Sequence, residues 1–185
     1  MNIPMIKKHL VVYRAKCHDL APHIAIVRSQ ASKEVYKKGT RYYRENESLI
    51  SLNGITAELV ARDWLQSQYK QGKVKQVDLT PLVDLDPIAE ADGIVDGKVV
   101  DFKHKGNGNR VFVNYASHNN KNKRCDVYYF VESNEKVIES ESGVIDYCNG
   151  VIYEIPASLV DHWEYTDKWV DKCYFYDIQE TDIIK

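Results

Sequence analysis

The spacing of hydrophobic residues changes from helix-like to strand-like near Lys73. Before that point a short strand is predicted at 9–15. Apolar residues then recur every three or four positions from about Asp19 to Glu47, which predicts an amphipathic helix. The first third of the chain is therefore expected to be mainly helical.

A second helix is predicted to begin at Asn53-Gly54, which interrupts the first pattern, and to end at Gly72. Asn is a favoured N-cap residue, and glycine commonly ends helices because it adopts positive φ. One apolar stripe should bury this helix, formed by Ile55, Leu59, Trp64 and Leu65.

Beyond Lys73 the pattern approaches a period of two, which is typical of half-buried strands. The segment 110–123 fits either a short helix or a loop, and Pro156 introduces a helix-like stretch at 157–165. The predicted strands lie at 74–77, 88–95, 98–104, 126–133, 150–155 and 172–178.

This order of elements predicts an α/β (α+β) fold with a mixed central β-sheet flanked by helices. A length of 185 residues fits a single domain. Within it we expect an N-terminal strand and basic helix at 1–53, a core at 54–131, and a C-terminal extension at 132–185 that packs on the core.

Composition narrows the functional classes only slightly. The net charge of -2 gives no global sign of a nucleic-acid partner, but Lys and Arg concentrate in 1–44 and 98–124 and acidic residues in 132–185. These zones could create an oriented field or simply be solvated faces. No apolar run fits a signal peptide or a membrane span, so a cytoplasmic protein without membrane contact is expected. The four scattered cysteines are expected to be ordinary thiols.

The chemistry of the chain concentrates in the stretch ADGIVDGKVVDFKHK. Asp96-Gly97 between two apolar runs predicts a hairpin with a two-residue type I′ turn. Val95 then pairs with Lys98, and continuing along both strands places Asp92 opposite Asp101.

Strand alternation places Glu90, Asp92, Asp101 and Lys103 on one face of this hairpin, with Val100 and Phe102 on the other. Carboxylates directly opposite one another repel. Either a divalent cation lies between them, or the face is exposed and water and the Glu90–Lys103 pair screen the charges. Both interpretations remain open on the residues alone.

Asp92, followed after eight residues by Asp101-Phe102-Lys103, resembles the D…(D/E)xK signature of the PD-(D/E)xK nuclease superfamily. The resemblance covers roughly 54–131 and implies a restriction-endonuclease-like fold. Many members carry a glutamate on the preceding helix, to which Glu58 corresponds. Two departures stand out: Ala91 replaces the usual proline, and Asp101 stands where glutamate is commoner.

The resemblance implies a Mg²⁺-dependent endonuclease that hydrolyses phosphodiester bonds in DNA, with Mn²⁺ as a substitute metal. Asp92 and Asp101 would bind the metal, with the Phe102 carbonyl as a further ligand and Glu58 binding directly or through water. Lys103 would orient the attacking water and stabilise developing charge. By analogy, a homodimer is expected.

Glu58 has an alternative interpretation as an ion pair with Arg62, four residues later on the helix. Substrate contacts are expected from two stretches after the motif, and Tyr42, Tyr43 and Tyr115 lie near basic residues and could stack on bases. The predicted nucleic-acid-binding residues are Lys105, Arg110, Asn119, Asn120, Lys121, Lys123 and Arg124.

Two other functional classes fit the same residues. One is a catalytically inactive domain of the same fold that binds nucleic acid or protein. The other is a metal-independent interaction protein whose acidic C-terminal region makes the contacts.

Overall fold

The computed structural model describes residues 5–35, 47–82, 91–106, 108–120, 125–139, 143, 145–167 and 172–184. The main sheet has seven strands, in the spatial order β10 (Ile183–Ile184), β1 (Ile6–Arg14), β7 (Ile145–Pro156), β6 (Val127–Glu139), β4 (Lys98–His104), β3 (Gly93–Val95) and β2 (Val77–Leu79). A smaller sheet contains β5 (Arg110–Asn114), β9 (Cys173–Asp177) and β8 (Glu164–Thr166).

The fold is mixed α/β, as the order of elements predicted. β4 runs parallel to β6, and β1 runs parallel to β10, while the other neighbouring pairs in both sheets are antiparallel. The described helices are α1 (Lys16–Val35), α2 (Glu47–Lys70), α3 (Tyr115–Asn119), α4 (Ala157–Val160) and the 3-10 helix η1 (Glu180–Asp182).

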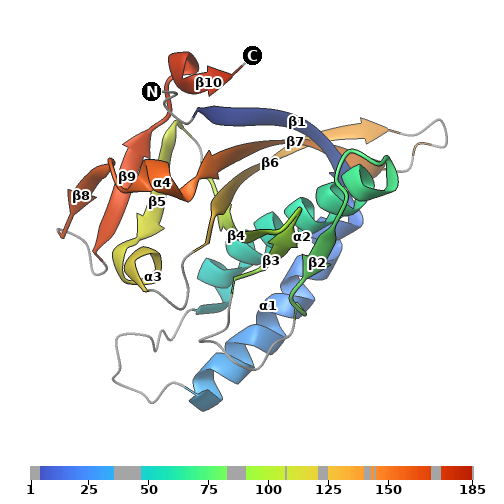
Figure 1. The fold of residues 1–185 in the computed structure, drawn as a ribbon. Helices are drawn as coiled ribbons and strands as arrows, with labels where there is room; N and C mark the ends of the chain where they lie inside the picture. The colour runs from blue at the N-terminus through green and yellow to red at the C-terminus, as the bar shows by residue number, and fades with distance from the viewer. Residues whose placement is uncertain are drawn as a thin grey trace.

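The main sheet separates two hydrophobic clusters. On one face, α1 and α2 pack side by side against the sheet, and α2 contributes Ile55, Val60 and Leu65 to that cluster. On the other face, the smaller sheet packs over residues such as Phe130 and Ile155 (Figure 1). Each strand of the main sheet can therefore present side chains to two different environments.

The α2 helix begins earlier than the sequence predicted and runs straight through Asn53-Gly54. The predicted break and N-cap at Asn53 are wrong, although the predicted end at Gly72 is confirmed by its positive φ of 71°. Gly costs about 1 kcal/mol in a helix interior. Here Asn53 and Gly54 lie on the exposed side, while Ile55 and its neighbours are buried. Burial of the adjacent turn outweighs the local preference.

Several strand boundaries also differ from the prediction. β4 matches its predicted range, and β6 extends to Glu139. β3 begins at Gly93, after the non-strand residues Ala91 and Asp92, and the predicted strand positions 88–90 lie outside the described residues. The segment 110–123 contains both β5 and α3, and the predicted helix at 157–165 stops at Val160, so that β8 follows. β7 lies between β1 and β6, so the sheet takes strands from all three predicted parts of the chain.

Two further properties bear on the sequence-based predictions. Within the described residues, no helix has an apolar run long enough to cross a bilayer. All four cysteines are free thiols, as expected, and three of them are buried.

Candidate functional site

The hairpin at the centre of the prediction forms in the expected register. Val95 pairs with Lys98, Ile94 with Val99 and Gly93 with Val100. The turn residues Asp96 and Gly97 have φ of 47° and 77°, the positive values that a type I′ turn requires.

The side chain of Asp96 also anchors this turn. Its Oδ1 accepts hydrogen bonds from the backbone N–H groups of Lys75 and Gln76, at 2.8 and 2.9 Å. The turn is thereby joined to the segment that leads into β2, and the start of β4 has a fixed position.

Asp92 lies just outside the β3–β4 ladder, where the two strands separate. β3 begins at Gly93, so the next N–H group on that edge of β4 has no strand opposite it. The Asp92 carboxylate takes that place, because its Oδ2 accepts a hydrogen bond of 2.6 Å from the Phe102 N–H. Asp92 therefore lies beside the Asp101-Phe102-Lys103 segment without being its direct strand partner.

The Phe102 carbonyl is directed toward the same edge as Asp92. Val99 and Lys105 hydrogen-bond through their backbones toward β6, the first to Asp126 and the second to Val131. Because the N–H and C=O of one strand residue point to the same edge and alternate along the strand, the even-numbered Phe102 faces away from β6. Its oxygen is available to a ligand placed next to Asp92.

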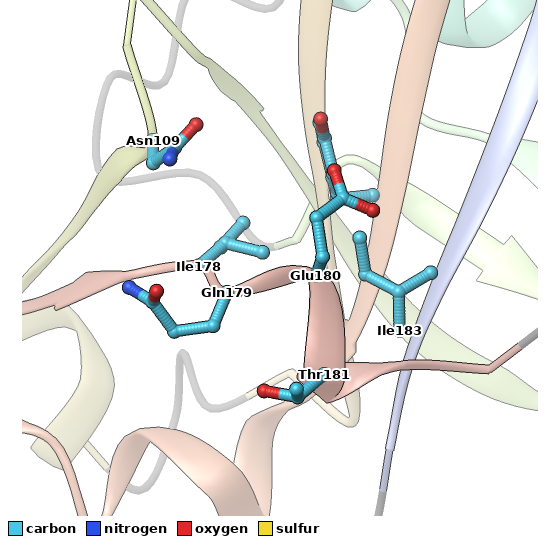
Figure 2. A pocket seen from close by; sticks show the side chains of 7 residues that line it. Asn109, Ile178, Gln179, Glu180, Thr181 and Ile183 are labelled. Atoms are coloured by element: carbon cyan, nitrogen blue, oxygen red, sulfur yellow. The ribbon is translucent and has the colours of Figure 1, made fainter.

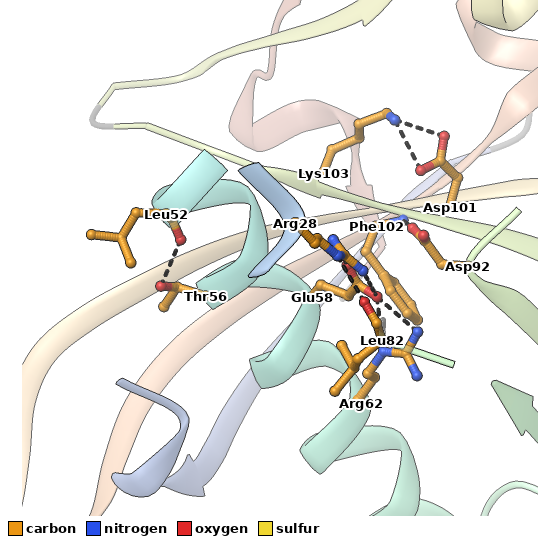
Figure 3. Close-up of polar contacts among 10 residues, drawn as sticks. All are labelled: Arg28, Leu52, Thr56, Glu58, Arg62, Leu82, Asp92, Asp101, Phe102 and Lys103. Carbon is orange, nitrogen blue, oxygen red and sulfur yellow. Dashed lines mark hydrogen bonds and ion pairs between the residues drawn. The ribbon is translucent and has the colours of Figure 1, made fainter. Parts of the chain in front are cut away.

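Asp101 and Lys103 project together from the face of β4 opposite the Phe102 ring. The Lys103 Nζ donates to Asp101 Oδ1 at 2.9 Å and lies 2.7 Å from Oδ2 (Figure 3). Their side chains are 20% and 31% exposed, so the pair is accessible from solvent. Burial is the largest single effect on the pKa of Lys103 and lowers it, but the hydrogen bond and charge of Asp101, with the charge of Asp92, together raise it. Lys103 is therefore protonated at neutral pH.

The pKa of Asp92 is raised to about 8. Burial is the largest cause, followed by the negative charges of Asp101 and Glu58, and the Phe102 N–H and Lys103 only partly oppose them. Three carboxylates are thus close enough to affect one another. A cation bound among them would relieve this crowding.

Glu58 is already held by two arginines. It is buried on α2, and its carboxylate accepts hydrogen bonds from Arg62 at 2.7 and 3.1 Å and from Arg28 at 2.8 and 3.2 Å. The pair with Arg62 is the alternative that the spacing had offered, although it is buried instead of exposed. Arg28, on α1, has no partner that the sequence pattern could have identified, and it also donates to the Leu82 carbonyl at 2.7 Å.

These positions fit a magnesium ion in part. Two carboxylates and a backbone carbonyl, completed by water, form a donor set that Mg²⁺ accepts. Asp92, Asp101 and the Phe102 carbonyl supply such a set, while Glu58 is neutralised by its arginines. Within the described residues, no three His, Cys, Asp or Glu side chains converge into a metal cage. The side-chain donors number two, and one of them must loosen its contact with Lys103.

The predicted substrate-binding residues are dispersed. Lys105 is buried, and its Nζ contacts Glu132 Oε2 at 2.6 Å and the Gly108 carbonyl, so its ammonium group already has partners within the protein. Arg110 is exposed but forms a two-point ion pair with Asp177, at 2.6 and 2.7 Å. The charged groups of both side chains therefore already form ion pairs within the protein.

Asn119 and Asn120 lie exposed at the end of α3. The remaining candidates fall outside the described residues, namely Glu90, Lys121, Lys123, Arg124, Tyr42 and Tyr43.

A pocket of about 320 Å³ lies elsewhere, between β7, β10 and the segment that joins β9 to η1 (Figure 2). Its lining is polar at Asn109, Gln179 and Thr181, with Glu180 at the rim. None of the predicted metal ligands lines it, so it is separate from the candidate site.

In comparisons with known proteins, no family model, no curated protein and no solved structure matches this chain. The functional argument therefore rests on the arrangement around Asp92, Asp101 and Lys103.

Proposed function

We propose that the chain is a Mg²⁺-dependent endonuclease of the PD-(D/E)xK type, with a restriction-endonuclease-like fold, that hydrolyses phosphodiester bonds in DNA. One observation carries the proposal. Where β3 leaves β4, the Asp92 carboxylate contacts the Phe102 backbone, and Asp101 and Lys103 project from the same three-residue segment.

Hydrolysis of a phosphodiester needs an activated water and neutralisation of charge on the phosphate. A bound magnesium ion would supply both, held by Asp92, Asp101 and the Phe102 carbonyl. The protein contributes the geometry, because the Asp96-Gly97 turn fixes β4 and the Phe102 N–H fixes the Asp92 carboxylate.

Lys103 acts as a cation and not as a base in this proposal. In the metal-free protein, where it pairs with Asp101, its pKa is raised, so it enters the site as a protonated ammonium group. Its ammonium group can hydrogen-bond the attacking water and a non-bridging phosphate oxygen, and it stabilises the negative charge that develops there.

The test is cleavage of supercoiled plasmid and of labelled duplex oligonucleotides, with Mg²⁺ and with EDTA. We expect cleavage only with Mg²⁺. Asp101→Asn and Lys103→Ala should each reduce the rate by about 100-fold or more, since both remove charge at the reacting centre. Lys98→Ala, at the exposed start of the same strand, is the matched control and should cleave at the wild-type rate.

Cleavage that persists in EDTA would contradict the proposal. So would cleavage by Asp101→Asn and Lys103→Ala at the wild-type rate. Circular dichroism of each variant separates lost chemistry from lost folding.

A second candidate is a catalytically inactive nucleic-acid- or protein-binding domain of the same fold. It is favoured by the fact that all three carboxylates already have partners: Asp92 the Phe102 N–H, Asp101 Lys103, and Glu58 two arginines. Binding of DNA without cleavage under any divalent metal would select this alternative.

A further inference from the structure

Three tyrosines form a partly exposed cluster at the end of the smaller sheet. Tyr115 begins α3, Tyr165 lies on β8 and Tyr174 lies on β9. Their ring centroids are 5.3 to 6.0 Å apart, with edge-to-face or tilted planes. Tyr115 and Tyr165 are 39% and 45% exposed, so aromatic surface remains open to solvent after the rings have packed on each other.

Hydrogen bonds hold this tyrosine cluster in place. Asn114 caps α3 by accepting from the Ser117 N–H at 3.1 Å, and the Tyr115 N–H donates to the Lys172 carbonyl at 2.9 Å. The exposed Asn119 amide donates to the Tyr115 carbonyl and to the Tyr174 hydroxyl, at 2.9 and 3.3 Å. The rings are therefore ordered before any ligand arrives, which lowers the entropic cost of binding to them.

A continuous set of contacts links the cluster to the candidate metal site. Asp101 pairs with Tyr128 across β4 and β6, so both side chains project from the same face of the main sheet. The Tyr128 hydroxyl lies 2.9 Å from His118 Nδ1, and the His118 ring meets Tyr174 edge to face at 5.4 Å.

His118 forms the rigid middle of this connection. It is almost fully buried, and its Nε2 contacts Asp161 Oδ1 at 2.9 Å. Its imidazole thus joins α3 to β6. The tyrosine cluster and Asp101 therefore lie at the two ends of one row of packed side chains.

The strand register places the cluster on the inner face of the smaller sheet. Tyr165 pairs with Tyr174 and Tyr174 with Val113, so these side chains share the face of the smaller sheet that packs toward the main sheet. The Arg110–Asp177 pair projects from the opposite face. Lys172, whose carbonyl accepts from the Tyr115 N–H, is exposed beside the cluster.

We propose that the tyrosine cluster binds an unpaired nucleotide of the substrate, whose base stacks on Tyr165 and Tyr115 while the strand continues to the Asp101–Lys103 segment. This inference rests on the proposed nuclease function and specifies its substrate. Bases in a duplex stack on each other and expose only their edges, so a side-chain ring can stack only on a base that is unpaired. The preferred substrate is therefore single-stranded DNA or duplex DNA with a single-stranded end.

Binding can be measured in EDTA, without cleavage, by fluorescence anisotropy. The probes are a fluorescein-labelled 15-nucleotide single strand, the matching blunt duplex and the same duplex with a single-stranded tail. We expect the wild type to bind the single strand and the tailed duplex at least about 5-fold more tightly than the blunt duplex. Equal affinity for all three would overturn the inference.

Substitution of Tyr165 tests the ring itself. Tyr165→Val keeps a residue suited to a strand and removes the stacking surface, so single-strand affinity should fall about 5- to 100-fold with blunt-duplex affinity unchanged. Tyr165→Phe should retain binding. Tyr69→Ala removes a tyrosine on α2 that is somewhat more exposed, at 54%, and serves as the control. Unchanged single-strand affinity in Tyr165→Val would overturn the inference.

Photocrosslinking of the wild type needs no substitution. A single strand with one 5-iodouracil, irradiated and mapped by mass spectrometry, should crosslink to Tyr115 or Tyr165, and crosslinks confined to other residues would overturn the inference. Mg²⁺-dependent cleavage together with equal single-strand affinity in wild type and Tyr165→Val would refute the tyrosine cluster but leave the nuclease. A protein that binds the single strand through Tyr165 but never cleaves would refute only the nuclease.

Discussion

At the residue scale, the candidate metal site is defined by the hydrogen bonds and ion pairs that its carboxylates form. Asp92 occupies the position of a missing strand neighbour beside Phe102, and burial together with the nearby charges of Asp101 and Glu58 raises its pKa to about 8. A buried acid in such surroundings is stable when protonated, or when a cation replaces the proton. The same residue can therefore report both on folding and on metal binding.

The raised pKa of Asp92 predicts how stability depends on pH in the metal-free protein. The folded state holds this proton up to about pH 8, whereas the unfolded chain loses it near pH 4. The contribution of Asp92 is therefore complete below pH 4 and is lost as pH rises from 4 to 8. In EDTA, urea denaturation should show Asp92→Asn gaining about 2 kcal/mol or more on wild type between pH 5 and pH 8.

Asp78→Asn, which changes an exposed aspartate on the neighbouring strand β2, should follow the wild-type pH dependence. Adding Mg²⁺ should stabilise the wild type more at pH 8 than at pH 5, because metal competes with the proton. Parallel pH curves for wild type and Asp92→Asn would show that the Asp92 carboxyl is not perturbed.

The turn and its register were accessible from the sequence at this scale, because Asp96-Gly97 has few conformations and side chains alternate along strands. The partners of Glu58 and Lys105 were only partly accessible. Arg62 lies within one helical turn of Glu58, but Arg28 and Glu132 reach their partners across about 30 residues. Long-range ion pairs leave no periodic signal in a single sequence.

At the element scale, ion pairs and hydrogen bonds connect α2 to α1 and to the segment after β2. Glu58 receives Arg62 from its own helix and Arg28 from α1, and Arg28 also donates to the Leu82 carbonyl after β2. The helix also continues through Asn53-Gly54, where burial of the next turn overrides local breakers. Packing thus determines both where α2 begins and how it is held.

Removal of the Glu58 carboxylate should destabilise this helix pair strongly. Glu58→Ala leaves two guanidinium groups without their partner in a largely buried position, and should lower the free energy of unfolding by about 3–5 kcal/mol. Urea denaturation measures the change, and Lys70→Ala, at the exposed end of α2, should stay within about 0.5 kcal/mol of wild type. Unchanged stability combined with lost cleavage would instead make Glu58 a metal ligand.

At the scale of the whole molecule, the net charge of -2 means that any nucleic acid must be held by local groups. Lys105 and Arg110 are committed to Glu132 and Asp177, so fewer cations are free than the sequence suggested. The sheet also takes strands from both ends of the chain, which hydrophobic periodicity alone could not predict, since it gives elements but not their neighbours.

The predicted homodimer belongs to this scale, since each proposed site would cut one strand and two would be needed for a double-strand break. Light scattering during gel filtration should give about twice the chain mass of 21.4 kDa. Plasmid cleavage should then yield linear product directly. A monomer that only nicks plasmid would contradict the dimer while leaving the site intact.

The central claim is that Asp92, Asp101 and the Phe102 carbonyl hold a divalent metal next to Lys103. Anomalous diffraction from a crystal soaked in Mn²⁺ tests it most directly. The account predicts a single strong peak at the edge of β4 where β3 departs, with oxygen atoms of all three residues about 2.0–2.3 Å away and Lys103 displaced from Asp101. A peak elsewhere, or none at this edge with the Lys103–Asp101 pair intact, would contradict it.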